Sequence, residues 1–242
     1  MLGFLGAPIG VAYHVVLALS ALLTPLGAGL ATAAAIALFT VGVRLTLSPL
    51  SYHAYRGQSS MAALQPKITE LRRRYPNQPD KLQQELTAMY RAEGGSALAG
   101  CLPLLLQLPF FSIMYRLFLS ARVGGQPNAL LARDLLRTPL GSHWLTAPGP
   151  ASMQGLLFVA LFVLLAGAAF MAARATRAAS PGSAGSAGQP AAAAALGRIL
   201  PYTTVAIAAF VPLAAGIYLL TSTAWSAAER AVLRRWIAAP PR

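Results

Sequence analysis

An arginine inside an apolar segment is the residue of this sequence with the plainest chemical meaning. Arg44 lies six positions before the end of the apolar run 30–50, which is roughly 9 Å from that end of a helix. A charged side chain at the centre of a bilayer costs about 2.5 kcal/mol or more, so it should face protein or water. Thr40 and Ser48, four residues to either side, share its helix face. Two interpretations stay open: a cation in a polar cavity, or a side chain that extends to the nearby lipid headgroups.

Polar side chains also interrupt other apolar segments. Gln107 lies within LPLLLQLPFF, and Thr204 lies in a later segment. Near the C-terminus, polar residues recur in steps of four, three and four: Tyr218, Ser222, Trp225 and Glu229. Each set by itself is typical of hydrogen bonds between helices. Together they favour one polar cavity, for which we predict six lining residues: Arg44, Thr40, Gln107, Tyr218, Thr204 and Ser222.

The ligand of such a cavity is expected to be anionic or polar. No acidic residue lies at mid-membrane depth beside Arg44, because Asp134 belongs to a loop and Glu229 lies near the end of the last apolar segment. A buried cation without a partner attracts a polar ligand or water. A peptide segment with acidic or polar residues fits this requirement.

Catalytic and metal-binding patterns are absent from the sequence. It contains no G-x-S-x-G, no H-E-x-x-H and no phosphate-binding G-x-x-x-x-G-K-[ST]. His14, His53 and His143 are isolated in sequence, so we expect no metal site. Pairs of intramembrane carboxylates, which proton-coupled pumps require, are also missing. We therefore expect neither enzyme activity nor a cofactor.

The composition predicts that the apolar segments lie in lipid. The chain is 56% hydrophobic and 10% charged, against roughly 25% charged residues in an ordinary soluble domain. The net charge of +13 is gathered between the apolar runs. This distribution is typical of residues that fix membrane orientation and contact anionic lipid. Ribosomal RNA remains an alternative partner of the same basic loops, whereas we expect no DNA partner.

The apolar runs predict an all-α, polytopic membrane protein. Pro212 indicates a tight turn that divides the last long run into two spans. The span before Pro212 is only roughly 20 Å long, so either residues 191–195 extend it or the bilayer thins around it. We predict a core, residues 30–233, with five transmembrane helices: 30–50, 98–120, 153–173, 199–211 and 213–233.

Residues 1–29 form a separate N-terminal segment. Within the apolar stretch 9–26, four polar side chains fall on one side of a helix: Tyr13, His14, Ser20 and Thr24. This stretch either lies in the membrane interface or crosses the membrane as a hairpin with the next segment. We favour the interfacial helix.

The loops predict the orientation of the chain. Fourteen Lys and Arg residues lie in segments 51–97 and 174–198 and from Arg230 onward, whereas loop 121–152 contains three. The positive-inside rule places the fourteen in the cytoplasm. We therefore predict a multi-pass protein of the bacterial inner membrane whose short basic tail, 234–242, is cytoplasmic.

The two cytoplasmic segments differ in character. Apolar residues of 51–97 recur in steps of three and four on both sides of the turn at 76–79, which predicts an antiparallel helical hairpin. Pro66 requires the first hairpin helix to kink or restart. Segment 174–198 contains SPGSAGSAGQPAAAAA, which is typical of a flexible linker.

Four strings in this sequence resemble the YidC insertase family: VRLTLSPL, QPK at 65–67, DKLQQELTAMYRAEG and GCLPLLLQLPFF. They lie between residues 30 and 120. The resemblance implies a five-helix core with a groove open to the cytoplasm and to lipid but closed toward the outside. It also implies that Arg44, Thr40, Gln107 and Tyr218 line the groove. The hairpin would recruit substrate, and its basic residues are Lys67, Arg72, Arg73, Arg74 and Lys81.

Several positions depart from the family pattern. Ser96-Ala97 replaces an Asn-Pro pair, and Leu213-Ala214 replaces a Ser-Gly pair. Leu219 and Thr223 stand where an aromatic residue and an asparagine are common. The resemblance therefore does not extend to the aromatic contacts of the last span.

The residues and the resemblance predict a membrane protein insertase and chaperone. The polar segment of a nascent membrane protein would enter the groove, and its apolar segment would leave sideways into lipid. We expect a monomer, with the ribosome and the Sec translocon as candidate partners. The alternatives are a small membrane transporter or channel, an intramembrane enzyme, and an assembly factor that does not insert its clients.

Overall fold

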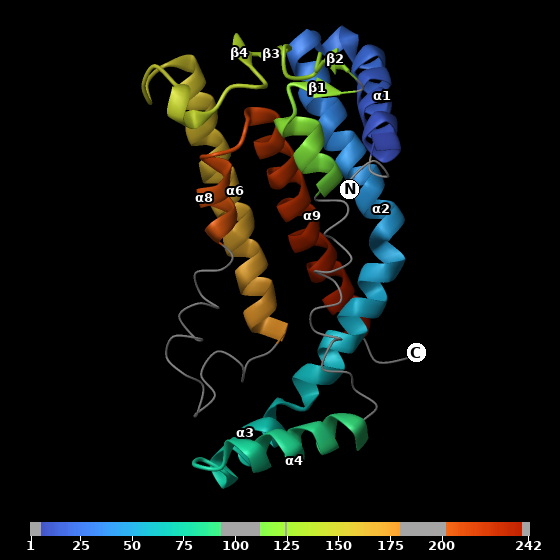
Figure 1. Ribbon diagram of the computed structural model, residues 1–242, viewed down its shortest axis with the longest axis vertical. Coiled ribbons are helices and arrows are strands. Elements are labelled where there is room, and N and C mark those ends of the chain that lie inside the picture. Colours follow the sequence, from blue (N-terminus) through green and yellow to red (C-terminus); the bar gives the residue numbers. More distant parts are fainter. Residues whose placement is uncertain (1–5, 93–111, 124, 180–201, 239–242) are drawn as a thin grey trace.

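A computed structural model describes residues 6–92, 112–123, 125–179 and 202–238. The described chain is mostly helical (Figure 1). Residues 112–119 form one helical stretch. Besides this stretch, the helices of six residues or more within the described residues are α1 (Gly6–Leu22), α2 (Ala28–Ala63), α3 (Gln65–Arg74), α4 (Pro79–Ala92), α6 (Met153–Ala179), α8 (Thr203–Ala208) and α9 (Leu213–Ala238).

Two helices of the described chain are long and apolar enough to cross a membrane. These are Gly29–Tyr55 within α2, 27 residues, and Met153–Arg174 within α6, 22 residues. At 1.5 Å per residue both exceed the roughly 30 Å of a hydrocarbon core. They overlap the first and third predicted spans. Most of the second span, and the beginning of the fourth, lie outside the described residues.

Helix α9 is the central element of the bundle. It lies between α2 and α6 and packs against both (Figure 1). Its turn with α8 falls at residues 209–212, where the sequence predicted a turn at Pro212. Gly216 lets α9 approach α6 closely, because a Cβ there would press against the side chain of Leu161.

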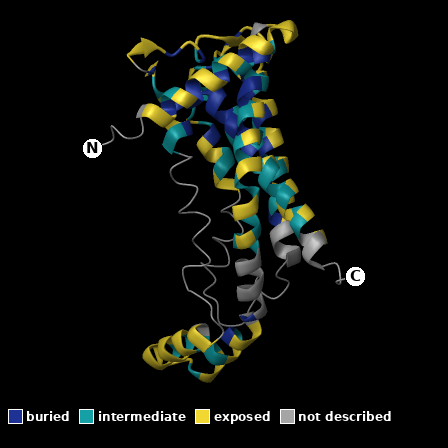
Figure 2. Cartoon of the chain, turned by 90° about the vertical axis from the view of Figure 1, so that its right-hand side faces the viewer, coloured by how far each residue is buried: buried dark blue, intermediate teal, exposed yellow. Residues whose placement is uncertain are grey.

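The buried core gathers at the end of the bundle that carries loop 121–152 (Figure 2). Side chains from α1, α2, the stretch 112–119 and α6 meet there, and the exposed residues of α2 and α6 lie outside it. Burial of each large apolar side chain contributes about 1.5–3 kcal/mol. The largest fully buried core side chains are Phe118, Phe158, Ile36, Leu117, Leu130, Leu140, Leu165 and Val16.

Loop 121–152 is ordered by backbone hydrogen bonds and two small antiparallel pairings. Strand β1 (Arg122–Val123) pairs with β2 (Gln126–Pro127), and β3 (Asp134–Leu135) pairs with β4 (Thr138–Pro139). The sequence predicted no strands here, because two-residue pairings leave no periodic pattern.

This loop also joins the ends of α2 and α9. The first two N–H groups of α9, at Leu213 and Ala214, donate to the carbonyls of Ser142 and Leu140 at 2.9 Å each. They are among the helix N–H groups that have no partner within the helix. On the other side, Gly29 of α2 lies against the backbone of Asp134, with no room for a Cβ. The loop therefore connects the two helices at one end of the bundle.

The first predicted span continues farther than the sequence indicated. Helix α2 runs past Leu50 to Ala63 with Pro49 inside it. The chain breaks at Leu64, and α3 begins at Gln65 with Pro66 in its first turn. Proline is tolerated there because the first N–H groups of a helix have no intrahelical partner. The restart near Pro66 agrees with the prediction, but the boundary at residue 51 does not coincide with a helix end.

Helix α1 packs along the beginning of α2 after the short helix η2 (Thr24–Leu26). The Ser20 and Thr32 hydroxyls share a buried 2.9 Å hydrogen bond. Tyr13 accepts a hydrogen bond from the backbone N–H of Ala129 at 3.3 Å, which links α1 to loop 121–152. These contacts show α1 paired with α2. Its interfacial placement stays a prediction.

Candidate functional site: an intramembrane arginine between two helices

The side chain of Arg44 turns toward α9. Its guanidinium donates a short hydrogen bond to the Ser222 hydroxyl, and Ser222 is itself buried. Because the apolar segment continues to Tyr55, Arg44 lies roughly 16 Å of helix before that end, farther than the apolar run alone suggested. The Arg44 side chain would therefore have to span a longer distance to reach the lipid headgroups at this end than the sequence indicated. The geometry agrees with the inward-facing interpretation.

Helix α9 also carries other polar and charged neighbours of Arg44. Glu229, two turns from Ser222, attracts the guanidinium electrostatically, whereas Arg230 repels it. Tyr218, one turn before Ser222, is a neutral phenol on the same face. In the described part of the chain, no carboxylate forms an ion pair with Arg44. The cation is thus held by a neutral hydroxyl, with a carboxylate farther along the same helix.

The other predicted lining residues take different positions. Thr40 is buried, with 3% of its surface exposed, and its hydroxyl donates to the backbone carbonyl of Ile36 at 2.7 Å. The Tyr218 ring is buried and lies 6.4 Å from the Phe118 ring, measured between centroids. Thr204 is half-buried on α8, which packs against α6 and α9. Gln107 lies outside the described residues.

Two polar atoms on α9 are buried without a hydrogen-bond partner within the described chain. They are the indole N–H of Trp225 and one carboxylate oxygen of Glu229. The sequence placed both residues in the stripe with Tyr218 and Ser222, but we did not predict them as site residues. The recurrence of polar residues in steps of three and four could have identified both as site residues. The missing hydrogen bonds are visible only in the structure.

The basic residues predicted for recruitment lie on α3 and α4, which pack against each other. Arg72, Arg73 and Arg74 form the last turn of α3, where the helix dipole favours cations. Lys67 and Lys81 are exposed. Their role in recruiting substrate stays a prediction.

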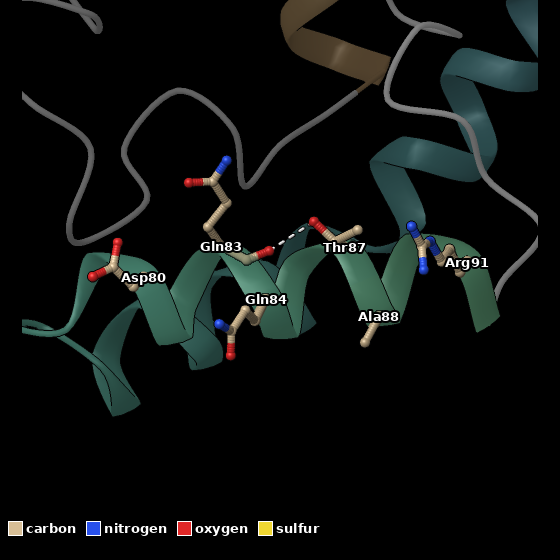
Figure 3. Close-up of a pocket in the computed structure, with 6 residues that line it drawn as sticks. All are labelled: Asp80, Gln83, Gln84, Thr87, Ala88 and Arg91. Atoms are coloured by element: carbon tan, nitrogen blue, oxygen red, sulfur yellow. Dashed lines mark hydrogen bonds between the residues drawn. The ribbon is translucent and has the colours of Figure 1, made fainter.

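The outer face of α4 is polar and nearly neutral (Figure 3). The Thr87 hydroxyl donates to the backbone carbonyl of Gln83 at 2.8 Å. This face combines amides and a hydroxyl with one acid and one base: Asp80, Gln83, Gln84, Thr87, Ala88 and Arg91. It is distinct from the basic end of the helix pair.

In the parts of the chain that the structure describes, no group of three or more His, Cys, Asp or Glu residues is arranged to hold a metal ion. The arrangement around Arg44 instead offers a hydrogen-bond donor with positive charge next to hydroxyl and aromatic groups. Such a site binds polar or anionic groups reversibly.

Similar proteins indicate the family of this chain. The family model of the 60Kd inner membrane protein matches residues 26–239. A relative named membrane protein insertase YidC, from Granulibacter bethesdensis, is 46% identical over 82 residues, which are 34% of this chain and 14% of that protein. The protein of the same name from Acidiphilium cryptum is 41% identical over 102 residues, 42% of this chain and 17% of that protein.

A shorter relative of the same name, from Clostridium perfringens, is 39% identical over 92 residues, 38% of this chain and 39% of that protein. The matched segments therefore span well under half of each of these three relatives. The name of these relatives describes membrane insertion and no enzymatic reaction. Because the family model covers most of the chain, this chain belongs to the family of the 60Kd inner membrane protein, among relatives named as YidC insertases.

Proposed function

We propose that this protein inserts other proteins into the bacterial inner membrane and chaperones them there. The relatives named as insertases support this role, as do two helices of membrane-spanning length. The observation that carries the proposal is the cation Arg44, which faces α9 inside the bundle and is held by one neutral hydroxyl.

A buried cation of this kind is a binding group without a permanent counter-charge. Removing a cation from water costs several kcal/mol unless other groups replace its hydration. Ser222 supplies one acceptor. The polar segment of a nascent membrane protein supplies further acceptors when it enters, and carboxylates bind a guanidinium most strongly. Arg44 therefore receives the segment that must cross the membrane.

The groove in this proposal lies between α2 and α9, with Arg44, Thr40, Gln107, Tyr218, Thr204 and Ser222 as its polar residues. The buried core at the loop 121–152 end supports a groove that is closed on that side. The opposite end, toward α3 and α4, is then the entrance from the cytoplasm. The apolar segment of the client leaves sideways into lipid, and burial of about 0.8 kcal/mol per CH₂ drives this step.

In the complete proposal the core has five membrane-crossing helices and a cytoplasmic C-terminus. Helices α3 and α4 form the cytoplasmic hairpin, whose basic residues meet the client first. The ribosome and the Sec translocon are partners that such a hairpin and groove could serve. The protein acts as a monomer, without metal or nucleotide.

Depletion of the protein followed by protease protection of a newly made small membrane protein tests this function. We expect insertion to fail on depletion and to recover with the wild-type chain. Arg44→Ala should restore abundance but insert clients with acidic outer segments several-fold more slowly. Arg235→Ala, at an exposed position of α9, is the matched control and should behave as wild type.

Normal insertion of several clients after depletion would contradict the insertase function. Loss of Arg44→Ala from the membrane would show instead that Arg44 is structural. An ion flux across liposomes that contain the purified protein would favour a transporter or channel.

A further inference from the structure

We infer that Trp225 and Glu229 form a subsite for the amide groups of the client's polypeptide backbone, separate from the charge-binding site at Arg44. This inference rests on the proposed insertase function. It concerns how the groove holds segments that carry no charge.

The evidence begins with two unsatisfied atoms. The Trp225 indole nitrogen Nε1 and the Glu229 oxygen Oε1 are both buried, and neither forms a hydrogen bond in the described chain. Leaving a buried polar group without a partner costs roughly 1–3 kcal/mol. Native structures contain few such groups, and each calls for a specific explanation, such as a missing ligand or water.

The position of the two atoms connects them to the groove. Trp225 and Glu229 are four residues apart and lie on the α9 face that carries Ser222. Ser222 bonds Arg44 directly, and Glu229 is among the electrostatic neighbours of that guanidinium. A segment bound at Arg44 and continuing along α9 toward α3 and α4 therefore passes both atoms.

The chemistry of the pair selects an amide. An indole N–H only donates, and a carboxylate only accepts. A phosphate or carboxylate ligand would be repelled by Glu229, and an ammonium ligand would leave the indole N–H unused. A peptide group has one N–H and one C=O, and a residue of an extended chain can bond through both at the same edge. The pair therefore satisfies a backbone whatever its side chains are.

Two sites of different selectivity allow the groove to bind client segments of varied sequence. Arg44 discriminates by charge, because only acidic or polar groups gain from it. The Trp225–Glu229 subsite is indifferent to side chains. An uncharged outer segment would be held mainly by the second site.

The test uses the full chain in vesicles of phosphatidylethanolamine and phosphatidylglycerol. The probe is a synthetic single-span peptide whose outer tail lacks Asp, Glu, Lys, Arg, His, Asn and Gln, so that neither side-chain charge nor side-chain amides contribute. The measured quantity is the initial rate at which the tail becomes protected from protease. We expect Trp225→Phe and Glu229→Leu each to lower it roughly two- to tenfold, and Glu229→Gln, which keeps an acceptor, to lower it less. Val232→Ala, on an exposed position of α9, should match wild type.

A second set of peptides measures the contribution of the client's backbone N–H groups alone. Replacing single tail amides by esters removes one N–H at a time without altering the side chains. At the position that meets Glu229, the ester should slow the wild type and have no added effect on Glu229→Leu. Equal ester effects in both proteins would overturn the subsite, as would wild-type rates for both Trp225→Phe and Glu229→Leu.

Thermal unfolding separates this role from a structural one. Since Nε1 of Trp225 bonds nothing in the described chain, exchanging Trp225 for 1-methyltryptophan, which keeps the indole ring but lacks the N–H, should leave Tm unchanged. A clear fall in Tm for this variant would mean that the N–H has a partner within the resting protein, and would overturn the inference. If wild-type vesicles translocate no faster than empty ones, the proposed insertase function fails, which differs from translocation that is insensitive to these variants.

Discussion

At the scale of single residues, the two hydroxyls near Arg44 have different uses. The Ser222 hydroxyl accepts from the guanidinium, whereas the Thr40 hydroxyl is occupied by the carbonyl of Ile36 in its own helix. A hydroxyl bonded to the preceding turn adds little to a groove. Sequence spacing put Thr40 and Ser222 in one group, and the hydrogen bonds distinguish them.

This difference predicts unequal effects of removing each hydroxyl. Ser222→Ala leaves a buried cation with one acceptor fewer and should lower the free energy of unfolding by roughly 1.5–3 kcal/mol. Thr40→Val, which keeps the side-chain shape, should cost less than about 1 kcal/mol, because the Ile36 carbonyl keeps its helical bond. Chemical denaturation in detergent micelles measures both values. Equal losses would show that the Arg44–Ser222 bond contributes no more than an ordinary hydroxyl.

At the scale of elements, the contact between α2 and loop 121–152 depends on one glycine. The loop bonds the start of α9 through Leu140 and Ser142 and meets α2 at Gly29. The two helices that carry Arg44 and Ser222 are thereby fixed relative to each other at one end. Beyond this end, the distance between α2 and α9 depends on how the loop fixes their first turns and on how the two helices pack against each other.

We therefore predict that Gly29→Ala is destabilising although alanine favours helices. The added Cβ meets the backbone of Asp134, and overpacking of this kind costs roughly 1–3 kcal/mol. Gly42→Ala, in the same helix with nothing within 4 Å of the added Cβ, is the control and should be neutral or stabilising by about 0.5–1 kcal/mol. The comparison is a thermal unfolding series in one detergent. If Gly29→Ala left the Tm unchanged, loop 121–152 would not contact α2 at this position in the membrane.

At the scale of the whole molecule, basic residues and buried core lie at opposite ends. Arg72, Arg73 and Arg74 belong to the α3–α4 pair, far along the bundle from the core at loop 121–152 (Figures 1 and 2). The positive-inside rule predicts that the α3–α4 end is cytoplasmic. A bundle with its buried core at one end and basic residues at the other has the polarity that the proposed insertion from the cytoplasm requires.

Cysteine labelling measures this orientation directly. In a Cys101→Ser background, Gln126→Cys in the loop and Gln78→Cys between α3 and α4 place thiols at exposed positions. We expect a membrane-impermeant maleimide to label position 126 in intact spheroplasts and position 78 only after permeabilisation. The reverse pattern would invert the topology and remove the cytoplasmic entrance from the proposal.

The sequence by itself determined the class of the protein and the neighbourhood of the site. Apolar runs, basic loops and Pro212 are local signals, so they predicted a helical membrane protein, the turn before α9 and the restart near Pro66. The family resemblance was confirmed by the family model, which matches residues 26–239. The spacing of Tyr218, Ser222, Trp225 and Glu229 marked the face of α9 on which Ser222 bonds Arg44.

Only the tertiary structure decided which of these residues meet. Arg44 and Ser222 are 178 positions apart in sequence, and helical periodicity carries no information about contacts between distant helices. The same holds for Gly29 against Asp134 and for the unsatisfied atoms of Trp225 and Glu229, because burial and hydrogen bonding depend on every element packed around them. The continuation of α2 past Leu50 was also hidden, since Pro49 and the polar residues after Leu50 gave no signal that one helix runs through them.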